Sequence, residues 1–218
     1  MREHFHNHRR SLQVRFLSIF LGTFFALFAL LNVRYLYASM RYWLVPGTIV
    51  SNTETTPSPF PLAQDIKYKP LPDEAQLIID RIGVNAPLVF GISSDPDSIY
   101  KALEQGVVHY SDTVKPGMEG PSVLLGHSSA YPWYQGGYGS VFALLSKLSI
   151  GDRFYIRYGD GRFFIFEVRD SIIFNPLSGD ARLHELEQTD GSTLILVSCY
   201  PVGTNYRRIA IRADLVSQ

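Results

Sequence analysis

The sequence predicts a mainly β domain, closed or nearly closed into a barrel, preceded by a single N-terminal membrane helix. Three observations support this fold class. An uncharged apolar run lies near the N-terminus, a proline-rich segment follows it, and the rest of the chain holds six to eight short strand-like runs with two minor helical ones. Long alternating βα units, which would indicate a layered α/β fold, are not present in the sequence.

Residues 16–33 carry no charge, and as a helix they would span roughly 27 Å, close to the thickness of the bilayer core. Four arginines precede the run, and aromatic residues follow it at the expected far interface: Arg2, Arg9, Arg10 and Arg15, then Tyr35, Tyr37, Tyr42 and Trp43. We therefore expect a cytoplasmic tail over residues 1–15, a transmembrane anchor over residues 16–38 and a single-pass protein of the cell membrane whose remainder lies outside the cytoplasm.

Two alternatives to the anchor are a cleaved signal peptide and a buried helix of a soluble domain. The apolar run is longer than the usual signal-peptide core, and Arg34 interrupts the approach to a small-residue cleavage site near Ala38. A buried helix of a soluble domain would be expected to show a polar face, and this run has none. Residues 39–74 hold six of the 13 prolines, between Pro46 and Pro72, and are predicted to form an extended extracytoplasmic spacer.

The predicted domain covers residues 75–218. A hairpin is expected around the Gly-Asp-Gly turn of residues 152–174. The other strand-like runs are 76–91, 107–110, 122–127, 192–199 and 206–216. Short helices are expected over residues 97–106, with Asp97 as the N-cap, and over residues 138–148, where apolar residues recur at helical spacing. The segment 175–191 is too long for a tight turn, so it is either a functional loop or a tolerated surface insertion.

Charge and cysteine content exclude several kinds of protein. The 20 basic and 20 acidic residues give no net charge, so nothing favours a nucleic-acid partner. The single cysteine, Cys199, excludes an intramolecular disulfide and any multi-thiolate metal site. Three interpretations of Cys199 remain: an inert buried side chain, an unpaired surface thiol or a nucleophile. Outside the cytoplasm a free thiol risks oxidation, which favours a use for it.

A cysteine nucleophile needs a neighbouring base, because a thiol is mostly protonated at neutral pH. Outside the predicted tail the candidates are His109, His127 and His184. His127 is the best placed of the three, since both it and Cys199 follow an apolar strand that stops abruptly at a loop. His109 lies within a predicted strand and His184 lies in the long loop.

Arg208 is the third candidate. Alternation along residues 206–212 places Ile209 and Ile211 on the core face and Arg208 on the opposite face. Because a short turn joins this strand to the cysteine strand, the two are expected to pair antiparallel and to bring Arg208 near Cys199. Arginine stays protonated, so its role would be to hold substrate or stabilise an oxyanion.

Taken together, these segments resemble the sortases, membrane-anchored cysteine transpeptidases of bacterial cell envelopes. The likeness covers about residues 76–214. The segment from Ile195 to Cys199 looks like the family's T-L-x-T-C strand, with Ile195 and Ser198 at the threonine positions. The other matching segments, in chain order, are Ile82-Gly83-Val84-Asn85-Ala86-Pro87, Gly106 to Tyr110, Val123 to Ser128 with the family histidine, Gly151-Asp152, and Tyr206 to Arg212 with the family arginine at Arg208.

The resemblance implies an eight-stranded barrel with two or three short helices, and a catalytic set of Cys199, His127 and Arg208. It also implies substrate contacts and a groove wall formed by residues 175–191. The expected substrate-binding residues are Leu196, Val197, Ser198, Tyr206 and Ser128. No cofactor is expected. Some sortases use calcium, but no acidic cluster in this sequence supports a calcium site.

The implied partners are secreted proteins with a C-terminal LPXTG-like sorting signal and an amine acceptor, such as a peptidoglycan precursor or a pilin lysine. The reaction would anchor proteins to the cell wall or link pilins, through a thioester on Cys199. Two alternatives remain open: a cell-surface binding module that keeps the barrel without turnover, and a thiol hydrolase that cleaves the same signal with water. Neither the sortase subclass nor the oligomeric state follows from the sequence.

Overall fold

The computed structural model describes residues 2–44, 71–130, 134, 136–177, 186 and 191–218. The chain divides into two compact units, residues 1–37 and residues 38–218. The predicted spacer, at residues 45–70, and His184 lie outside the described residues. The N-terminal helices are α1 (Arg2–Leu31) and α2 (Val33–Leu44), so the predicted anchor is divided at Asn32.

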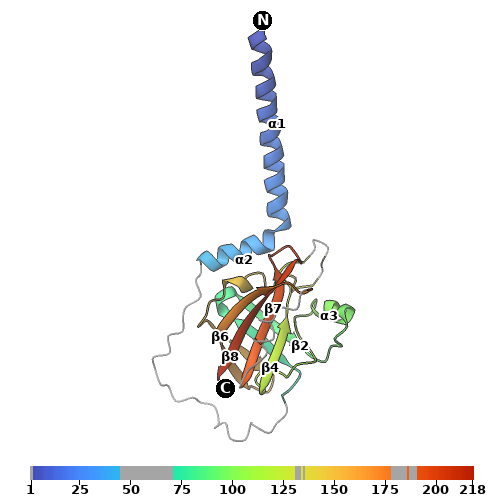
Figure 1. Ribbon diagram of the computed structural model, residues 1–218, viewed down its shortest axis with the longest axis vertical. Coiled ribbons are helices and arrows are strands. Elements are labelled where there is room, and N and C mark those ends of the chain that lie inside the picture. The colour runs from blue at the N-terminus through green and yellow to red at the C-terminus, as the bar shows by residue number, and fades with distance from the viewer. Residues whose placement is uncertain (1, 45–70, 131–133, 135, 178–185, 187–190) are drawn as a thin grey trace. The chain divides into compact units, whose positions relative to one another are not determined.

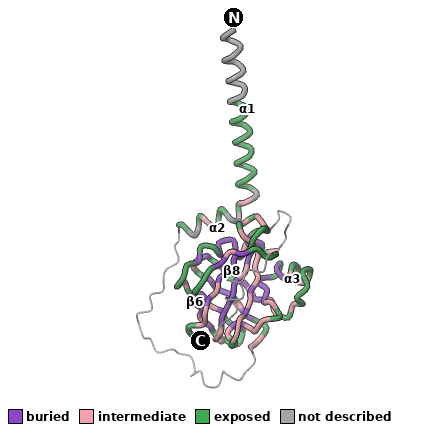
Figure 2. Tube along the Cα trace, in the orientation of Figure 1, coloured by how far each residue is buried: buried purple, intermediate pink, exposed green. Residues whose placement is uncertain are grey.

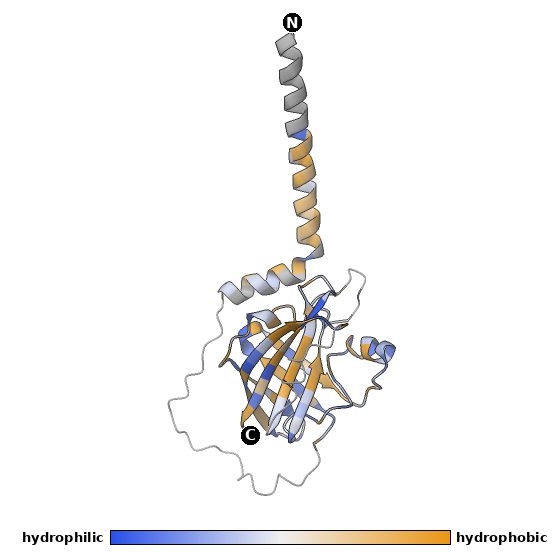
Figure 3. Cartoon of the chain, in the orientation of Figure 1, coloured by the Kyte–Doolittle hydropathy of each residue, from blue (hydrophilic) through white to orange (hydrophobic). Residues whose placement is uncertain are grey.

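The described part of α1 is apolar and exposed along its second half (Figure 3), where Phe20, Phe25 and Leu30 are between 57% and 71% accessible. When the described residues are searched for a helix that is both long and apolar enough to span a bilayer, none is found. The anchor over residues 16–38 therefore stays a prediction.

Eight strands of the second unit close into a barrel, as predicted (Figure 1). In order around the barrel they are β1 (Ala75–Ile79), β2 (Val84–Val89), β3 (Val107–His109), β4 (Gly120–Leu125), β7 (Ser192–Tyr200), β8 (Arg207–Ser217), β6 (Phe163–Phe174) and β5 (Arg153–Tyr158), after which β5 pairs with β1. Strands β2 and β3 pair in parallel, as do β4 and β7, and the other neighbours are antiparallel. Closure leaves no unpaired sheet edge.

Large apolar side chains fill the barrel interior, including Leu77, Ile79, Phe154, Phe166 and Leu196, each at most 1% accessible. Figure 2 shows buried stretches of chain throughout the barrel. These side chains recur at every second position of their strands, so each strand has one face in the core and one outside. On β7 and β8 the outward positions Ile195 and Ala210 are buried as well, because Leu186 and the end of β6 pack over them.

Helix α3 (Pro96–Ala102) overlaps the predicted range 97–106, but it begins one residue earlier and its N-cap is Asp95 rather than Asp97. The Asp95 carboxylate accepts a hydrogen bond from the Ser98 amide at 2.9 Å, and this bond lowers the pKa of Asp95 to about 2. Pro96 explains the position of the cap, because its fixed φ and missing N–H suit the first residue of a helix.

The helix predicted over residues 138–148 is wrong. The segment consists of turns and a short 3₁₀ helix, η2 (Leu145–Lys147), with a second 3₁₀ helix, η1 (Asp80–Ile82), elsewhere in the barrel. The Phe142 amide donates to the carbonyl of His127 at 2.8 Å, which removes it from a helical hydrogen-bond ladder. Four consecutive side chains are buried, so the segment has no solvent face of the kind that an amphipathic helix needs: Phe142, Ala143, Leu144 and Leu145.

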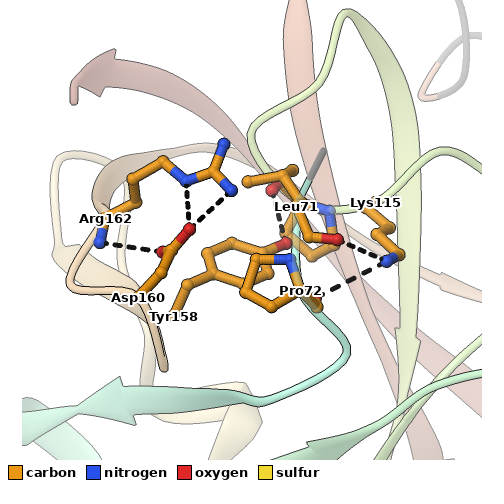
Figure 4. A network of polar contacts seen from close by, with 7 residues as sticks. Leu71, Pro72, Lys115, Tyr158, Asp160 and Arg162 are labelled. Atoms are coloured by element: carbon orange, nitrogen blue, oxygen red, sulfur yellow. Dashed lines mark hydrogen bonds and ion pairs between the residues drawn. The ribbon is translucent and has the colours of Figure 1, made fainter. Parts of the chain in front are cut away.

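At the end of β4 opposite to His127, polar contacts tie the chain that precedes β1 to the barrel (Figure 4). The Lys115 ammonium donates to the carbonyl of Leu71 at 2.8 Å and pairs with Asp73, while the Tyr158 hydroxyl donates to the carbonyl of Pro116 at 2.8 Å. Burial raises the pKa of Tyr158, so its hydroxyl keeps the proton that it donates. These bonds fix where the domain begins.

We expect buried His109 to make stability fall at acid pH. Its Nε2 lies 2.8 Å from the carbonyl of Val114, the residue is 5% accessible, and burial lowers its pKa. The unfolded chain, with a pKa near 6.5, therefore binds the proton more readily, so this stabilising contribution is full above about pH 6.5 and is lost as the pH falls below it. The measurement is urea unfolding of wild type and His109→Gln from pH 7.5 to 5. The difference in unfolding free energy between wild type and His109→Gln should decrease by on the order of 1 kcal/mol as the pH falls from 7.5 to 5. A difference that does not change with pH would contradict the prediction.

Candidate active site

Cys199 lies on the outer face of β7, one residue before the strand ends. Leu194, Leu196 and Ser198 point into the barrel, and the alternate positions, including Val197 and Cys199, point outward. The cysteine is free and partly exposed. It therefore has the access to solvent that a nucleophile needs and that an inert core cysteine lacks.

The parallel pairing of β4 with β7 leads the chain at His127 toward the end of β7 that carries Cys199. Leu125 is the register partner of Val197, so two residues further along His127 comes level with Cys199 on the same outer face. The pairing continues past the end of β4, because the Gly126 amide donates to the Val197 carbonyl at 3.1 Å and the Ser198 hydroxyl donates to the Gly126 carbonyl at 2.7 Å. The apolar run before His127 thus forms β4, and the register of β4 with β7 sets the position of the histidine.

Arg208 is placed on the other side of Cys199 by the antiparallel pairing of β7 with β8, in which these two residues are direct partners. Ile209 and Ile211 are buried, so Arg208 points outward as the alternation predicted. Its Nη1 donates to the carbonyls of Asn205 and Arg207 at 3.0 and 3.1 Å. The backbone position of Arg208 therefore neighbours that of Cys199 on the strand opposite to the one that leads to His127.

Gly126 and Phe142 fix the strand end that carries His127. A Cβ on Gly126 would come within 2.4 Å of the Phe142 ring, which is 1% accessible and cannot move aside easily. The backbone of Phe142 also binds the carbonyl of His127, as described above. A second contact joins the following loop to the β7–β8 turn, where the Gly203 amide donates to the Ser129 hydroxyl at 3.1 Å. The histidine and cysteine segments are thus joined by hydrogen bonds between their backbones and the hydroxyls of Ser129 and Ser198.

Aromatic rings surround His127. The Tyr134 ring meets the imidazole edge to face with centroids 5.6 Å apart, and the Tyr100 ring lies tilted at 6.5 Å. Burial among these groups lowers the pKa of His127, while the negative charge of Glu104 acts in the opposite direction. The imidazole is consequently neutral around pH 7 as long as no anion forms beside it, which is the state required of a general base.

Comparison with known proteins identifies the family of this domain. A family model described as the sortase domain matches residues 77–216. The chain belongs to the sortase family. A curated relative, sortase D of Bacillus subtilis (strain 168), is 30% identical over 154 residues, which cover 69% of this chain and 68% of the relative. Sortases are cysteine transpeptidases that act on proteins bearing a sorting signal and on amine acceptors.

Solved sortases share the fold. Sortase C1 from Streptococcus suis superposes with a TM-score of 0.53 at 24% identity, covering 67% of this chain and 74% of that one. A sortase D5 transpeptidase from Clostridium perfringens gives a TM-score of 0.51 at 22% identity, covering 70% of this chain and 85% of the other. At these identities the likeness shows the barrel alone.

A buried apolar cluster lies on the outer face of this sortase barrel, where Val123 and Val197 are its partly buried members. Its members come from β4, β6, β7, β8 and the segment between β6 and β7: Val123, Ile172, Phe174, Leu186, Ile195, Val197 and Ala210. Leu186, from the predicted loop 175–191, is 2% accessible and packs in this cluster. Of that loop's interior, residues 178–185 and 187–190 lie outside the described residues, so its role as a groove wall stays a prediction.

The predicted substrate contacts of the sortase domain divide into two groups. Val197 faces outward beside Cys199, and Tyr206 is 75% exposed at the β7–β8 turn. Leu196 and Ser198 point into the barrel at 0% and 3% accessibility, so their side chains do not fit direct contact with a peptide on the outer face. Ser128 is also buried, at 2%. Ser198 instead joins the cysteine strand to the histidine segment through its bond to the Gly126 carbonyl.

Sequence reasoning missed three residues around the sortase histidine: Tyr100, Glu104 and Tyr134. The signal for the first two was present, because residues four apart share one face of the predicted helix. Tyr134 belongs to the aromatic loop that follows His127. Nothing in the sequence indicated that the loop and the helix meet, which the structure shows by a bond from the Tyr134 hydroxyl to the Leu103 carbonyl at 3.0 Å. The candidate His109 is buried and bonded to Val114, away from this set.

Proposed function

We propose that this sortase cleaves an LPXTG-like sorting signal through a thioester on Cys199 and transfers the protein to an amine acceptor. The observation that supports the proposal is the register of three adjacent strands: Cys199 and Arg208 are register partners, and the register of β4 with β7, extended by two residues, brings His127 level with Cys199. This order gives a nucleophile with a proton carrier on one side and a fixed cation on the other.

The first half-reaction forms the thioester. The Cys199 thiolate attacks the carbonyl carbon of the scissile peptide bond, and the Arg208 guanidinium stabilises the negative charge on the carbonyl oxygen. His127, as imidazolium, donates its proton to the departing nitrogen when the C–N bond breaks. The products are a free amine and an acyl group on sulfur.

The second half-reaction returns the enzyme to its starting state. An acceptor amine attacks the thioester carbon, His127 takes a proton from that nitrogen, and the C–S bond breaks with its electron pair going to Cys199. The thiolate and imidazolium are thereby restored. The acceptor is proposed to be an amine of a peptidoglycan precursor or a pilin lysine, which would attach the protein to the wall or to a pilus.

We further propose that residues 16–38 anchor this enzyme in the cell membrane with its catalytic domain outside. The uncharged run, the arginines that precede it and the aromatic residues that follow it support this topology. Secreted substrates would then meet the active site as they leave the membrane.

The test uses the full chain in mild detergent, a panel of quenched LPXTG-like peptides and an added amine. Intact-protein mass spectrometry should show an adduct on Cys199 with the mass of the acyl fragment, and chromatography should show ligated peptide. Cleavage without ligation at every amine tried would favour a hydrolase. Absence of both adduct and cleavage, with Cys199 unreactive toward a thiol-alkylating probe, would favour a non-catalytic binding module.

We expect Tyr134→Ala to shift the acid limb of the pH profile of kcat/KM upward. Removal of the ring exposes His127 to water, so its lowered pKa rises toward the usual value for histidine. When His127 has a lower pKa than Cys199, the acid limb of kcat/KM follows the protonation of His127 in the free enzyme. A rise in the pKa of His127 therefore moves the acid limb to higher pH. Peptide cleavage measured from pH 5 to 9 gives the limb. Tyr134→Phe keeps the ring and is the matched control. An unmoved limb in the alanine variant would contradict the prediction.

A further inference from the structure

The C-terminal turn of α3 presents two side chains on one face. Tyr100 and Glu104 are four residues apart, and helical hydrogen bonds continue beyond the helix, from the Leu103 amide to the Ile99 carbonyl at 2.9 Å and from the Glu104 amide to the Lys101 carbonyl at 3.3 Å. Residues with this spacing lie one above the other on a helical surface. Both side chains are exposed, Tyr100 at 64%.

This face of α3 is held against the active-site histidine. The Tyr100 ring centroid is 6.5 Å from that of His127, and the Tyr134 ring, 5.6 Å from His127, carries the hydroxyl that binds the Leu103 carbonyl. Glu104 immediately follows Leu103. The backbone that carries Glu104 is therefore anchored to the Tyr134 ring, which packs on His127. The negative charge of Glu104 raises the pKa of His127, against the larger effect of burial.

The neighbouring cation on the helix belongs to another face. Lys101 lines a shallow depression of about 290 Å³ together with Ser98, Ala102 and Gln105. Lys101 and Gln105 are themselves four residues apart, so the depression and the Tyr100–Glu104 face are offset around the helix axis. The face beside His127 thus combines a carboxylate with an exposed aromatic ring.

A carboxylate next to an aromatic face is the chemistry that recognises an ammonium group. We propose that Glu104 and Tyr100 form a receiving site for the cationic amine of the acceptor, on the side of Cys199 where His127 stands. This inference rests on the proposed transpeptidase function and adds residues that determine acceptor specificity. Arg208 lies across Cys199 from His127, so the acceptor amine and the oxyanion are stabilised on opposite sides of the thioester.

The chemistry at this site balances as follows. The bound ammonium releases one proton to solvent, and the resulting neutral amine attacks the thioester carbon. A C–N bond forms, the C–S bond breaks with its electrons going to Cys199, and the second nitrogen proton passes to neutral His127. Because His127 must reach that nitrogen, an acceptor held by Glu104 and Tyr100 is already beside its base.

The experiment measures the apparent KM for the acceptor in peptide ligation by the full chain in detergent. Two acceptors are compared at pH 7.5: Nα-acetyl-lysine amide, which is cationic, and hydroxylamine, which is neutral at this pH. Glu104→Gln should raise the KM for the lysine derivative about five- to tenfold and leave that for hydroxylamine unchanged. The increase in KM for the lysine derivative that Glu104→Gln causes should be smaller in 0.5 M NaCl, because added salt screens exposed charges. Tyr100→Leu should raise the same KM about threefold.

Glu119→Gln is the matched control, since Glu119 is an exposed carboxylate next to the start of β4, at the opposite end of the strand from His127. It should leave both KM values unchanged. The inference is overturned when Glu104→Gln leaves the KM for the lysine derivative unchanged, or raises it equally for hydroxylamine. Those results differ from failure of the proposed function itself, in which the wild-type chain forms neither acyl-enzyme nor ligated product and both proposals fall together.

Discussion

Replacing Cys199 by alanine is expected to abolish peptide cleavage and ligation together, with kcat/KM reduced at least about 10⁴-fold. The chain has one thiol, and it stands level with His127 and opposite Arg208 on the outer face of the barrel. Without sulfur no thioester forms, so both half-reactions stop. Cleavage is measured with the quenched peptide, and the acyl-enzyme with mass spectrometry.

Two further measurements distinguish loss of chemistry from loss of structure. Cys199→Ala should bind the peptide with a Kd within about twofold of wild type, because the change removes one sulfur atom and leaves the partly buried Val197 and the cluster that it packs on in place. Cys199→Ser should also be inactive, since a serine hydroxyl is a much weaker nucleophile than a thiolate in the same position. Cleavage retained by the alanine variant would place the nucleophile elsewhere and would contradict the mechanism.

Much of the barrel could be predicted because its strands are bounded by strong local signals. The hairpin of β5 and β6 surrounds a Gly-Asp-Gly turn, and β7 ends before a proline and a glycine. Alternation along β8 also placed Ile209 in the core and Arg208 outside. These features depend on neighbours in the sequence, so a single chain is enough to find them.

The errors occurred where distant contacts decide local structure. Residues 138–148 have helical apolar spacing, yet Phe142 gives its amide to the carbonyl of His127, so turns replace the helix. The interior positions Leu196 and Ser198 share a motif with Cys199, but the pleat turns them away from it. The tyrosines around His127 come from a helix and a loop that meet only in the folded domain. Such contacts have no local sequence signal.

Arg208→Lys is expected to lower kcat/KM for peptide cleavage about 10²- to 10³-fold, although the positive charge is kept. In the described structure Nη1 is engaged by the carbonyls of Asn205 and Arg207, which restrains the guanidinium at the β7–β8 turn, and Arg208 is the register partner of Cys199. The Nε and Nη2 donors then remain to hold a developing oxyanion. A lysine ammonium is a single point donor on a flexible stem and cannot keep both sets of bonds.

Arg207 supplies the matched control for this prediction. It is adjacent in sequence and exposed, but its register partner is Tyr200 and the pleat points it away from Cys199. Arg207→Lys should leave kcat/KM within about threefold of wild type, and thermal unfolding of both variants should match wild type. A larger loss for Arg207→Lys than for Arg208→Lys would mean that the oxyanion is stabilised from the other face of β8. Because these two arginines differ only in the face that alternation gives them, the comparison tests the strand register on which the proposed mechanism depends.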